Sequence, residues 1–126
     1  MFHLLLVMLG GAVGAGCRYL VGRTCLSMWG PDFPWGTLVV NVVGGLAMGV
    51  LIGWLAARAT GDSGLRYLLG MGVLGGFTTF SAFSLETVLM LERNEYWTAL
   101  LYILVSVIGS LTALFAGLHL SRSVLA

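Results

Sequence analysis

Residues 70–84 read Gly-Met-Gly-Val-Leu-Gly-Gly-Phe-Thr-Thr-Phe-Ser-Ala-Phe-Ser, which places glycines and threonines in the middle of a hydrophobic segment. Each glycine costs roughly 1 kcal/mol of helix propensity, and threonine is also a weak helix former. We therefore predict a break in this helix between Gly75 and Thr78. If the segment crosses a membrane, the freed carbonyls need protein, water or an ion as partners, and discontinuous helices often surround a bound cation. An intact helix with a packing notch is the alternative.

The composition of the whole chain indicates that this segment does lie in a membrane. Of its 126 residues, 59% are hydrophobic and 9% are charged, whereas soluble domains average roughly 25% charged residues. Such a chain cannot cover a water-soluble surface. The composition thus excludes a soluble enzyme, a disordered chain and a disulfide scaffold. The net charge of +1 gives no field that would attract nucleic acid, and Cys17 and Cys25 match no metal-binding spacing.

Four apolar segments are long enough to cross a membrane, which takes about 20 residues each. Short connections remain at 29–35, 58–66 and 92–95, so residues 1–126 are expected to form a single integral membrane domain. The first segment is interpreted as a retained span rather than a cleaved signal, because no basic residue precedes it. The predicted spans run from about Phe2 to Gly22, Trp35 to Ala57, Leu65 to Met90 and Tyr96 to Leu120.

The arginines do not select an orientation for these spans. With four spans, both termini and the middle connection share one side of the membrane. Insertion in both orientations and a weak bias towards one orientation both remain open. One side carries Arg58, Arg66 and Arg122, and the other carries Arg23, Arg93 and, if it snorkels, Arg18.

Small residues recur every four positions in several spans, as at Gly45, Gly49 and Gly53 in the second. This spacing puts them on one helix face, where they allow close backbone approach in lipid. The pattern predicts tight helix packing, within or between subunits. Because four short helices make a poor pore alone, we expect a dimer or a larger assembly.

Two phenylalanines and a track of hydroxyls give the third and fourth spans a possible chemistry. Phe80 and Phe83 share a helix face. Such a pair usually packs in a core or against lipid, but the positive ring edges attract a small anion. Tyr102, Ser106 and Ser110 follow one another at four-residue spacing. Each hydroxyl can bond its own helix, yet three in register favour a hydrated or anion-conducting face.

Two further polar residues lie within or near the ends of spans. Asn41 lies about six residues into the second span, where its amide needs partners. It either joins helices or donates hydrogen bonds to a dehydrated anion. Glu86, near the end of the third span, is a functional candidate by its position, or it is simply solvated.

Taken together, these motifs closely resemble the Fluc (CrcB) family of bacterial fluoride channels, over essentially the whole chain. The third motif is the most specific. The resemblance implies an all-α, antiparallel, dual-topology homodimer in the bacterial inner membrane, with a third helix broken in mid-membrane. It implies passive, selective export of fluoride from the cytoplasm through two pores, and no enzyme activity. The residues that carry it are Gly10 to Ala15 with Arg18 and Tyr19, Gly36 to Asn41, and Gly72 to Phe83.

The resemblance also implies roles for individual residues. Phe80 and Phe83 would form the aromatic fluoride path, with Asn41 as a pore-lining donor. The family holds a central structural sodium ion through carbonyls of the broken span, and both subunits would contribute the matching Gly75 and Thr78. The partners implied are fluoride, a second copy and membrane lipid, but not nucleic acid. Polar pore residues would be Ser81, Thr79, Tyr102, Ser106 and Ser110, with Arg18 near the wide end of the pore.

Two other classes of protein remain as alternatives. A coupled small multidrug exporter also has four spans, but it uses a glutamate in its first span, and here the first span has no acid. A membrane subunit that only assembles with partners would not need the polar track or the interrupted span. An enzyme has little support, because the sequence carries neither an HExxH motif nor a Ser/His/Asp set.

Overall fold

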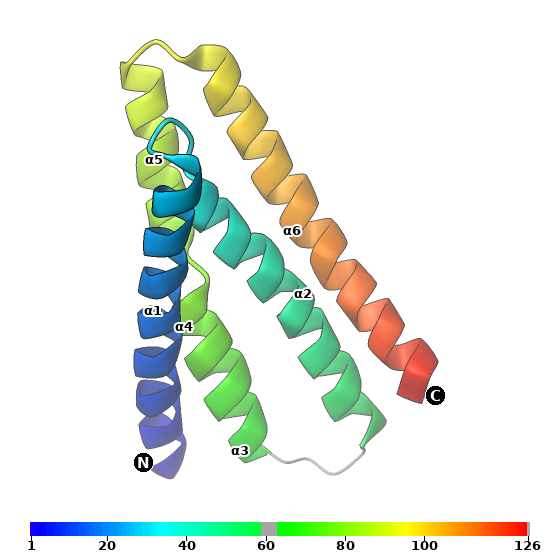
Figure 1. Ribbon diagram of the computed structural model, residues 1–126. Coiled ribbons are helices and arrows are strands. Elements are labelled where there is room, and N and C mark those ends of the chain that lie inside the picture. Colours follow the sequence, from blue (N-terminus) through cyan, green and yellow to red (C-terminus); the bar gives the residue numbers. More distant parts are fainter. Residues whose placement is uncertain (59–62, 126) are drawn as a thin grey trace.

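The computed structural model describes residues 1–58 and 63–125, and in these ranges the chain is helical apart from short connections. The chain traverses the molecule four times in alternating directions, so both termini lie towards the same end (Figure 1). Four helical segments are long and apolar enough to cross a membrane, as the sequence predicts. They are α1 (Phe2–Trp29), α2 (Trp35–Ala57), the interrupted segment Arg66–Glu92, and α6 (Tyr96–Leu125).

The helix ends agree with the prediction where a strong local signal exists. Both ends of α2 lie where they are predicted. Helix α1 instead continues through Arg23, because the chain meets no helix breaker before Gly30, whose φ of 79° ends the helix. Helix α6 extends to Leu125. Residues 59–62 of the expected polar connection lie outside the described part of the chain.

The third crossing consists of several helical pieces. The short α3 (Ser63–Leu65) leads into η1 (Arg66–Leu74), a π-helix that the sequence does not predict. Helix α4 (Gly75–Phe77) follows, and α5 (Phe80–Glu92) completes the crossing.

The backbone is extended at Thr78 (φ −81°, ψ 158°) and at Thr79 (φ −152°, ψ 119°). Glycines 75 and 76, where the predicted break begins, remain helical. Their modest propensity cost does not decide the position of the interruption.

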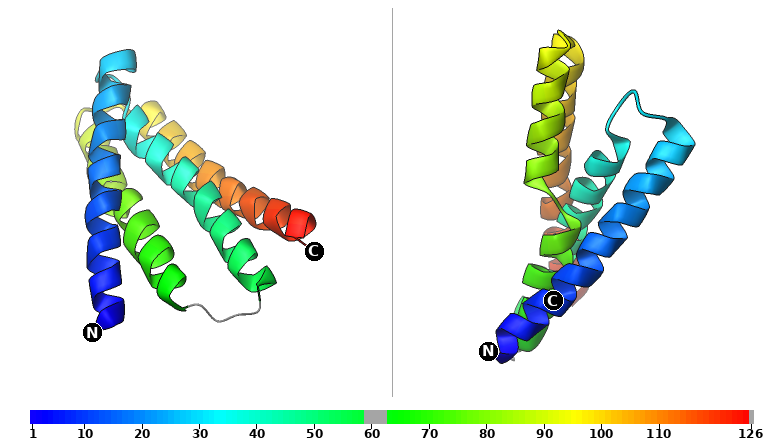
Figure 2. Two further views of the ribbon diagram at one scale, coloured as in Figure 1. Left: turned by 60° about the horizontal axis from the view of Figure 1, so that its bottom comes forward. Right: turned by 90° about the vertical axis from the view of Figure 1, so that its left-hand side faces the viewer.

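Glycines bring the helices together in two pairs within the chain. Helix α1 packs along η1 and α4, while α2 packs along α6 (Figures 1 and 2). A Cβ added at Gly14 would lie 2.0 Å from the carbonyl oxygen of Val73, and one at Gly49 would lie 2.1 Å from that of Leu114. Neither position has room for a side chain. The predicted close packing of the glycine faces is therefore observed inside the subunit.

The buried core is small and lies between α2, α5 and α6. It consists of Leu38, Phe83, Met90, Ala99 and Tyr102. Many large apolar side chains lie on the outside instead, on every long helix. Such a surface requires lipid or another protein as its surroundings.

Candidate functional site

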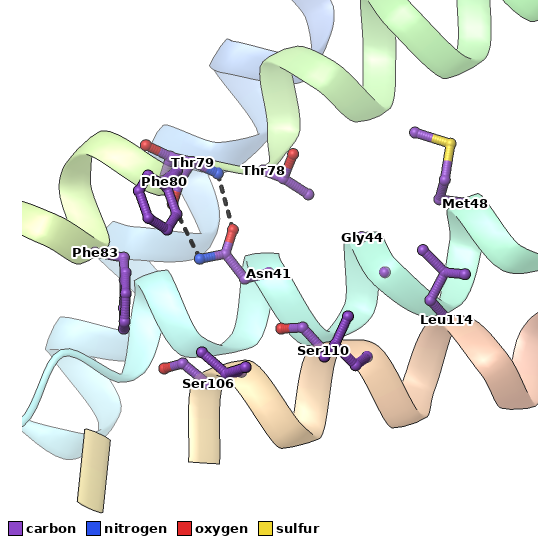
Figure 3. A pocket seen from close by; sticks show the side chains of 13 residues that line it. Asn41, Gly44, Met48, Thr78, Thr79, Phe80, Phe83, Ser106, Ser110 and Leu114 are labelled. Atoms are coloured by element: carbon purple, nitrogen blue, oxygen red, sulfur yellow. Dashed lines mark hydrogen bonds between the residues drawn. The ribbon is translucent and has the colours of Figure 1, made fainter. Parts of the chain in front are cut away.

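A pocket of about 390 Å³ lies between α2 and α6, next to the interruption of the third crossing (Figure 3). It brings together residues from the second, third and fourth crossings, which lie far apart in the sequence. Among the described residues that line it, none is charged. The predicted site residues that line it are Asn41, Thr78, Thr79, Phe80, Phe83, Ser106 and Ser110.

The side chain of Asn41 holds the interruption in place. Its Nδ2 donates to the carbonyl of Thr79 at 3.0 Å, and its Oδ1 accepts from the amide of Thr79 at 2.8 Å (Figure 3). The side-chain amide thus replaces helical partners that extended residues cannot have. Of the two roles considered for Asn41, joining elements is observed directly. Its second N–H remains as a possible donor to the pocket.

Thr79 also caps α5. Its Oγ1 accepts from the amide of Ala82 at 3.2 Å, which satisfies one of the free donors at a helix N-terminus. Ser81 is exposed and does not line the pocket, although its hydroxyl lies 3.3 Å from that of Thr79. The first turn of α5 therefore starts at the edge of the pocket, with its positive dipole end there.

The two phenylalanines lie next to each other but in different environments. Their ring centroids are 5.6 Å apart, with the planes inclined at 43°. Phe80 is 78% exposed, whereas Phe83 is 9% exposed and its centroid lies 5.2 Å from that of Tyr102. Phe83 is thus held by packing, while the outer ring of Phe80 faces the space beyond the subunit.

The hydroxyls of Ser106 and Ser110 are the unpaired polar groups of the pocket. Both oxygens are buried, and neither has a hydrogen-bond partner among the described residues. Leaving a buried hydroxyl unpaired costs about 1–3 kcal/mol. Water or a ligand in the pocket would satisfy these two groups, which lie on consecutive turns of α6.

Tyr102, the third member of the predicted track, has another partner. It is fully buried, and its hydroxyl donates to Oε2 of Glu86 at 3.1 Å. The hydroxyl of Thr37 donates to the other carboxylate oxygen at 2.6 Å. Glu86 is therefore held by two hydroxyls rather than simply solvated. Thr37 was not among the residues predicted to form the site, although an acid in a span signals a need for donors.

Arg18 lies in a neighbouring pocket of about 300 Å³ between α1 and α2. Thr37 and Thr79 also line this pocket, and Thr79 lines the first pocket as well. The half-buried arginine is thus separated from the hydroxyls of α6 by the segment that Asn41 holds.

The carbonyls of Gly75 and Thr78 fit the requirement for a cation held by backbone oxygens. In a continuous helix, the amide of Thr79 would donate to the carbonyl of Gly75, and that of Ala82 to the carbonyl of Thr78. Here the first amide donates to Asn41, and the second donates to the hydroxyl of Thr79. Both carbonyls have therefore lost their helical donors.

Four apolar crossings, three of which line an uncharged pocket with hydroxyls, an amide and aromatic rings, define a helical membrane protein. A comparison of the sequence with known families matches residues 5–118 to the family described as "CrcB-like protein, Camphor Resistance (CrcB)". The chain belongs to this family, as the motifs of its first three spans suggest.

Relatives cover nearly the whole chain. A protein of Sphingopyxis alaskensis is 56% identical over 116 residues, which are 92% of each chain. A protein of Chelativorans sp. is 53% identical over 99% of this chain and 100% of its own. One of Caulobacter vibrioides is 54% identical over the full length of both chains. All three carry the name "Fluoride-specific ion channel FluC". The family is one of channels, which confirms the prediction that the chain is not an enzyme.

Proposed function

We propose that this chain is a fluoride channel, which lets fluoride leave the cytoplasm passively and excludes chloride. The names of its relatives support fluoride as the ion. The observation that carries the proposal is the pair of buried, unpaired hydroxyls of Ser106 and Ser110 in an uncharged pocket. These groups are donors without acceptors, and a dehydrated anion is an acceptor.

The mechanism follows from how strongly fluoride holds its water. A path must replace the hydration shell with donors, yet bind the ion weakly enough for release. The hydroxyls of Ser106 and Ser110 and the free N–H of Asn41 supply modest donors on one side. The positive edges of Phe80 and Phe83 supply weak attraction on the other. Because none of the pocket's lining residues carries a positive charge, the ion is not trapped.

We further infer that the working unit is an antiparallel homodimer with two pores. The pocket is open at the side where Phe80 lies 78% exposed, so a second subunit would close the path there. The near balance of arginines between the two sides supports insertion in both orientations. A tag on the C-terminus should then be detected on both sides of the membrane, and detection on one side alone would exclude dual topology.

A structural sodium ion would be held by the carbonyls of Gly75 and Thr78 from both subunits, at the interruption in mid-membrane. The ion would supply positive charge that fixes these carbonyl dipoles. The nearby serine and threonine hydroxyls, together with the side chain of Asn41, would then hold the backbone of the interruption in place around the ion. Purified protein should unfold at a higher temperature in sodium than in potassium at equal ionic strength, because a ligand of the native state stabilises it. Equal unfolding temperatures would argue against the ion.

The bacterial relatives support a location in the bacterial inner membrane as a multi-pass protein. The four apolar helices are consistent with this location.

The function is tested by ion efflux from liposomes that contain the purified chain. Fluoride and chloride electrodes follow efflux, with valinomycin and potassium to balance charge. We expect fluoride efflux that needs valinomycin, together with negligible chloride efflux. No efflux from verified dimeric protein would overturn the channel assignment, and substrate movement driven by a proton gradient would favour a coupled exporter.

A further inference from the structure

Helix α2 carries a second concave surface on the face opposite the pocket. Val50 lies nine residues after Asn41, about two and a half turns at roughly 3.6 residues per turn, so the two side chains point in opposite directions. A groove of about 420 Å³ runs along this back face towards η1. All of its lining residues are apolar, and we call it the α2 groove: Val43, Leu46, Ala47, Val50, Leu51, Trp54 and Leu69.

Two arginines lie at one end of the α2 groove. The guanidinium carbon of Arg58 lies 4.1 Å from the centre of the Trp54 ring, which lines the groove. On η1, Arg66 precedes the lining residue Leu69 by three positions, which is less than one turn of this π-helix, so Arg66 starts the helix at the same end of the groove. Both arginines are exposed; Arg58 follows the end of α2, and Arg66 begins η1. The groove therefore leads from apolar side chains to two cations.

Neither cation is neutralised by a carboxylate within residues 1–58 and 63–125. In that part of the chain the ion pair that forms is Arg93 with Glu95, at 3.3 Å. It belongs to the connection between α5 and α6, which lies at the opposite end of the molecule from α3 (Figure 1). The stacked guanidinium of Arg58 keeps its N–H groups free at its edge. An arginine in this state matches a phosphate, which accepts two parallel hydrogen bonds.

We propose that the α2 groove binds one anionic phospholipid. An acyl chain lies along Val43, Leu46 and Val50, and the lipid phosphate accepts hydrogen bonds from Arg58 and Arg66. Trp54 marks the level of the headgroups, where tryptophan is enriched in membrane proteins. A zwitterionic lipid fits the apolar part equally well, but its ammonium group opposes the two arginines. The site is thus selective for negative headgroups, and it does not depend on fluoride permeation.

The test is native mass spectrometry of the purified full chain with dioleoyl-phosphatidylglycerol or dioleoyl-phosphatidylcholine added in detergent. Phosphatidylglycerol should remain bound at one molecule per chain, and phosphatidylcholine should bind more weakly. Each basic residue near an anionic headgroup contributes about 1 kcal/mol, which is about fivefold in affinity. The double variant Arg58→Gln and Arg66→Gln should therefore lower the preference for phosphatidylglycerol over phosphatidylcholine about 25-fold.

Three comparisons make the result specific. Arg93→Gln removes one charge at the other end and should leave the preference intact. Val50→Trp fills the groove but keeps both arginines, and it should weaken binding of both lipids. Inorganic phosphate in excess should not displace the lipid, because it lacks the acyl chain. Equal binding of the two lipids by the unmodified protein, or a preference that survives in the double variant, would overturn the proposal.

Discussion

Asn41 and Thr79, 38 residues apart in sequence, close a pair of hydrogen bonds in which one side-chain amide satisfies both the N–H and the carbonyl of one residue. Because Thr79 also caps α5 and lines the pocket, this contact determines where the third crossing is interrupted. It also holds the start of α5 against the serines of α6. The shape of the backbone at the interruption and the chemistry of the site thus depend on the same pair of residues.

Replacing Asn41 by Asp should impair both stability and transport. The carboxylate cannot donate to the carbonyl of Thr79, which loses a buried partner at about 1–3 kcal/mol, and a negative charge at the pocket repels an anion. We expect a lower unfolding temperature in detergent and fluoride efflux reduced at least tenfold. Asn94→Asp is the control, since Asn94 Oδ1 only accepts from Tyr96. Normal efflux in the Asn41 variant would remove this residue from the path.

Replacing Ser106 and Ser110 by alanine should reduce fluoride transport without lowering the stability of the protein. These hydroxyls have no partner in the described chain, so their removal should leave the free energy of unfolding unchanged or raise it by up to about 1 kcal/mol, with an equal or higher unfolding temperature. Fluoride efflux should fall about tenfold or more, because a hydrogen bond to a charged group contributes about 1.5–3 kcal/mol. Ser121→Ala removes a similarly unpaired hydroxyl outside the pocket and should not change efflux. A double variant with unaltered efflux contradicts the proposed role of the serines.

Isoleucine at Phe80 and at Phe83 should give different stabilities but similar losses of efflux. Phe83 is buried against Tyr102, and losing this ring contact costs about 1 kcal/mol. Phe80 is exposed in the subunit, so its replacement should change subunit stability little. Both variants should lose most fluoride efflux in liposomes, whereas Phe115→Ile, at an exposed ring on α6, should keep it. Wild-type efflux in both variants would refute the aromatic path.

Alanine at Gly49 should disrupt the pairing of α2 with α6. The new Cβ would lie 2.1 Å from the carbonyl oxygen of Leu114. Because that oxygen belongs to the backbone, the clash is relieved only if the two helices move apart. Overpacking of this kind costs about 1–3 kcal/mol or more, so we expect a lower unfolding temperature and less folded protein by size-exclusion chromatography. At Gly16 a Cβ meets nothing within 4 Å, and Gly16→Ala should be neutral or stabilising by about 1 kcal/mol. Equal behaviour of the two variants would show that the α2–α6 contact has room for a methyl group at position 49.

Part of the site could be predicted because its residues stand in recognisable local patterns. The spacing of Ser106 and Ser110, and that of Phe80 and Phe83, places each pair on one helix face. What each side chain bonds to was not predictable in this way. Tyr102 shares the spacing of the serines, yet it donates to Glu86 and does not line the pocket. Thr37 lies in the motif from Gly36 to Asn41, but only its contact with Glu86 reveals what its side chain bonds to.

The sequence by itself determined the class of fold, the number of crossings and both ends of α2. Hydropathy, length and breakers such as Gly30 are local properties, and a helix needs only neighbours along the chain to satisfy its backbone. Only the tertiary structure decided that the interruption lies at Thr78 and Thr79, and that the glycine faces meet inside one subunit. These outcomes depend on contacts between distant residues, such as Asn41 with Thr79, which no local pattern encodes.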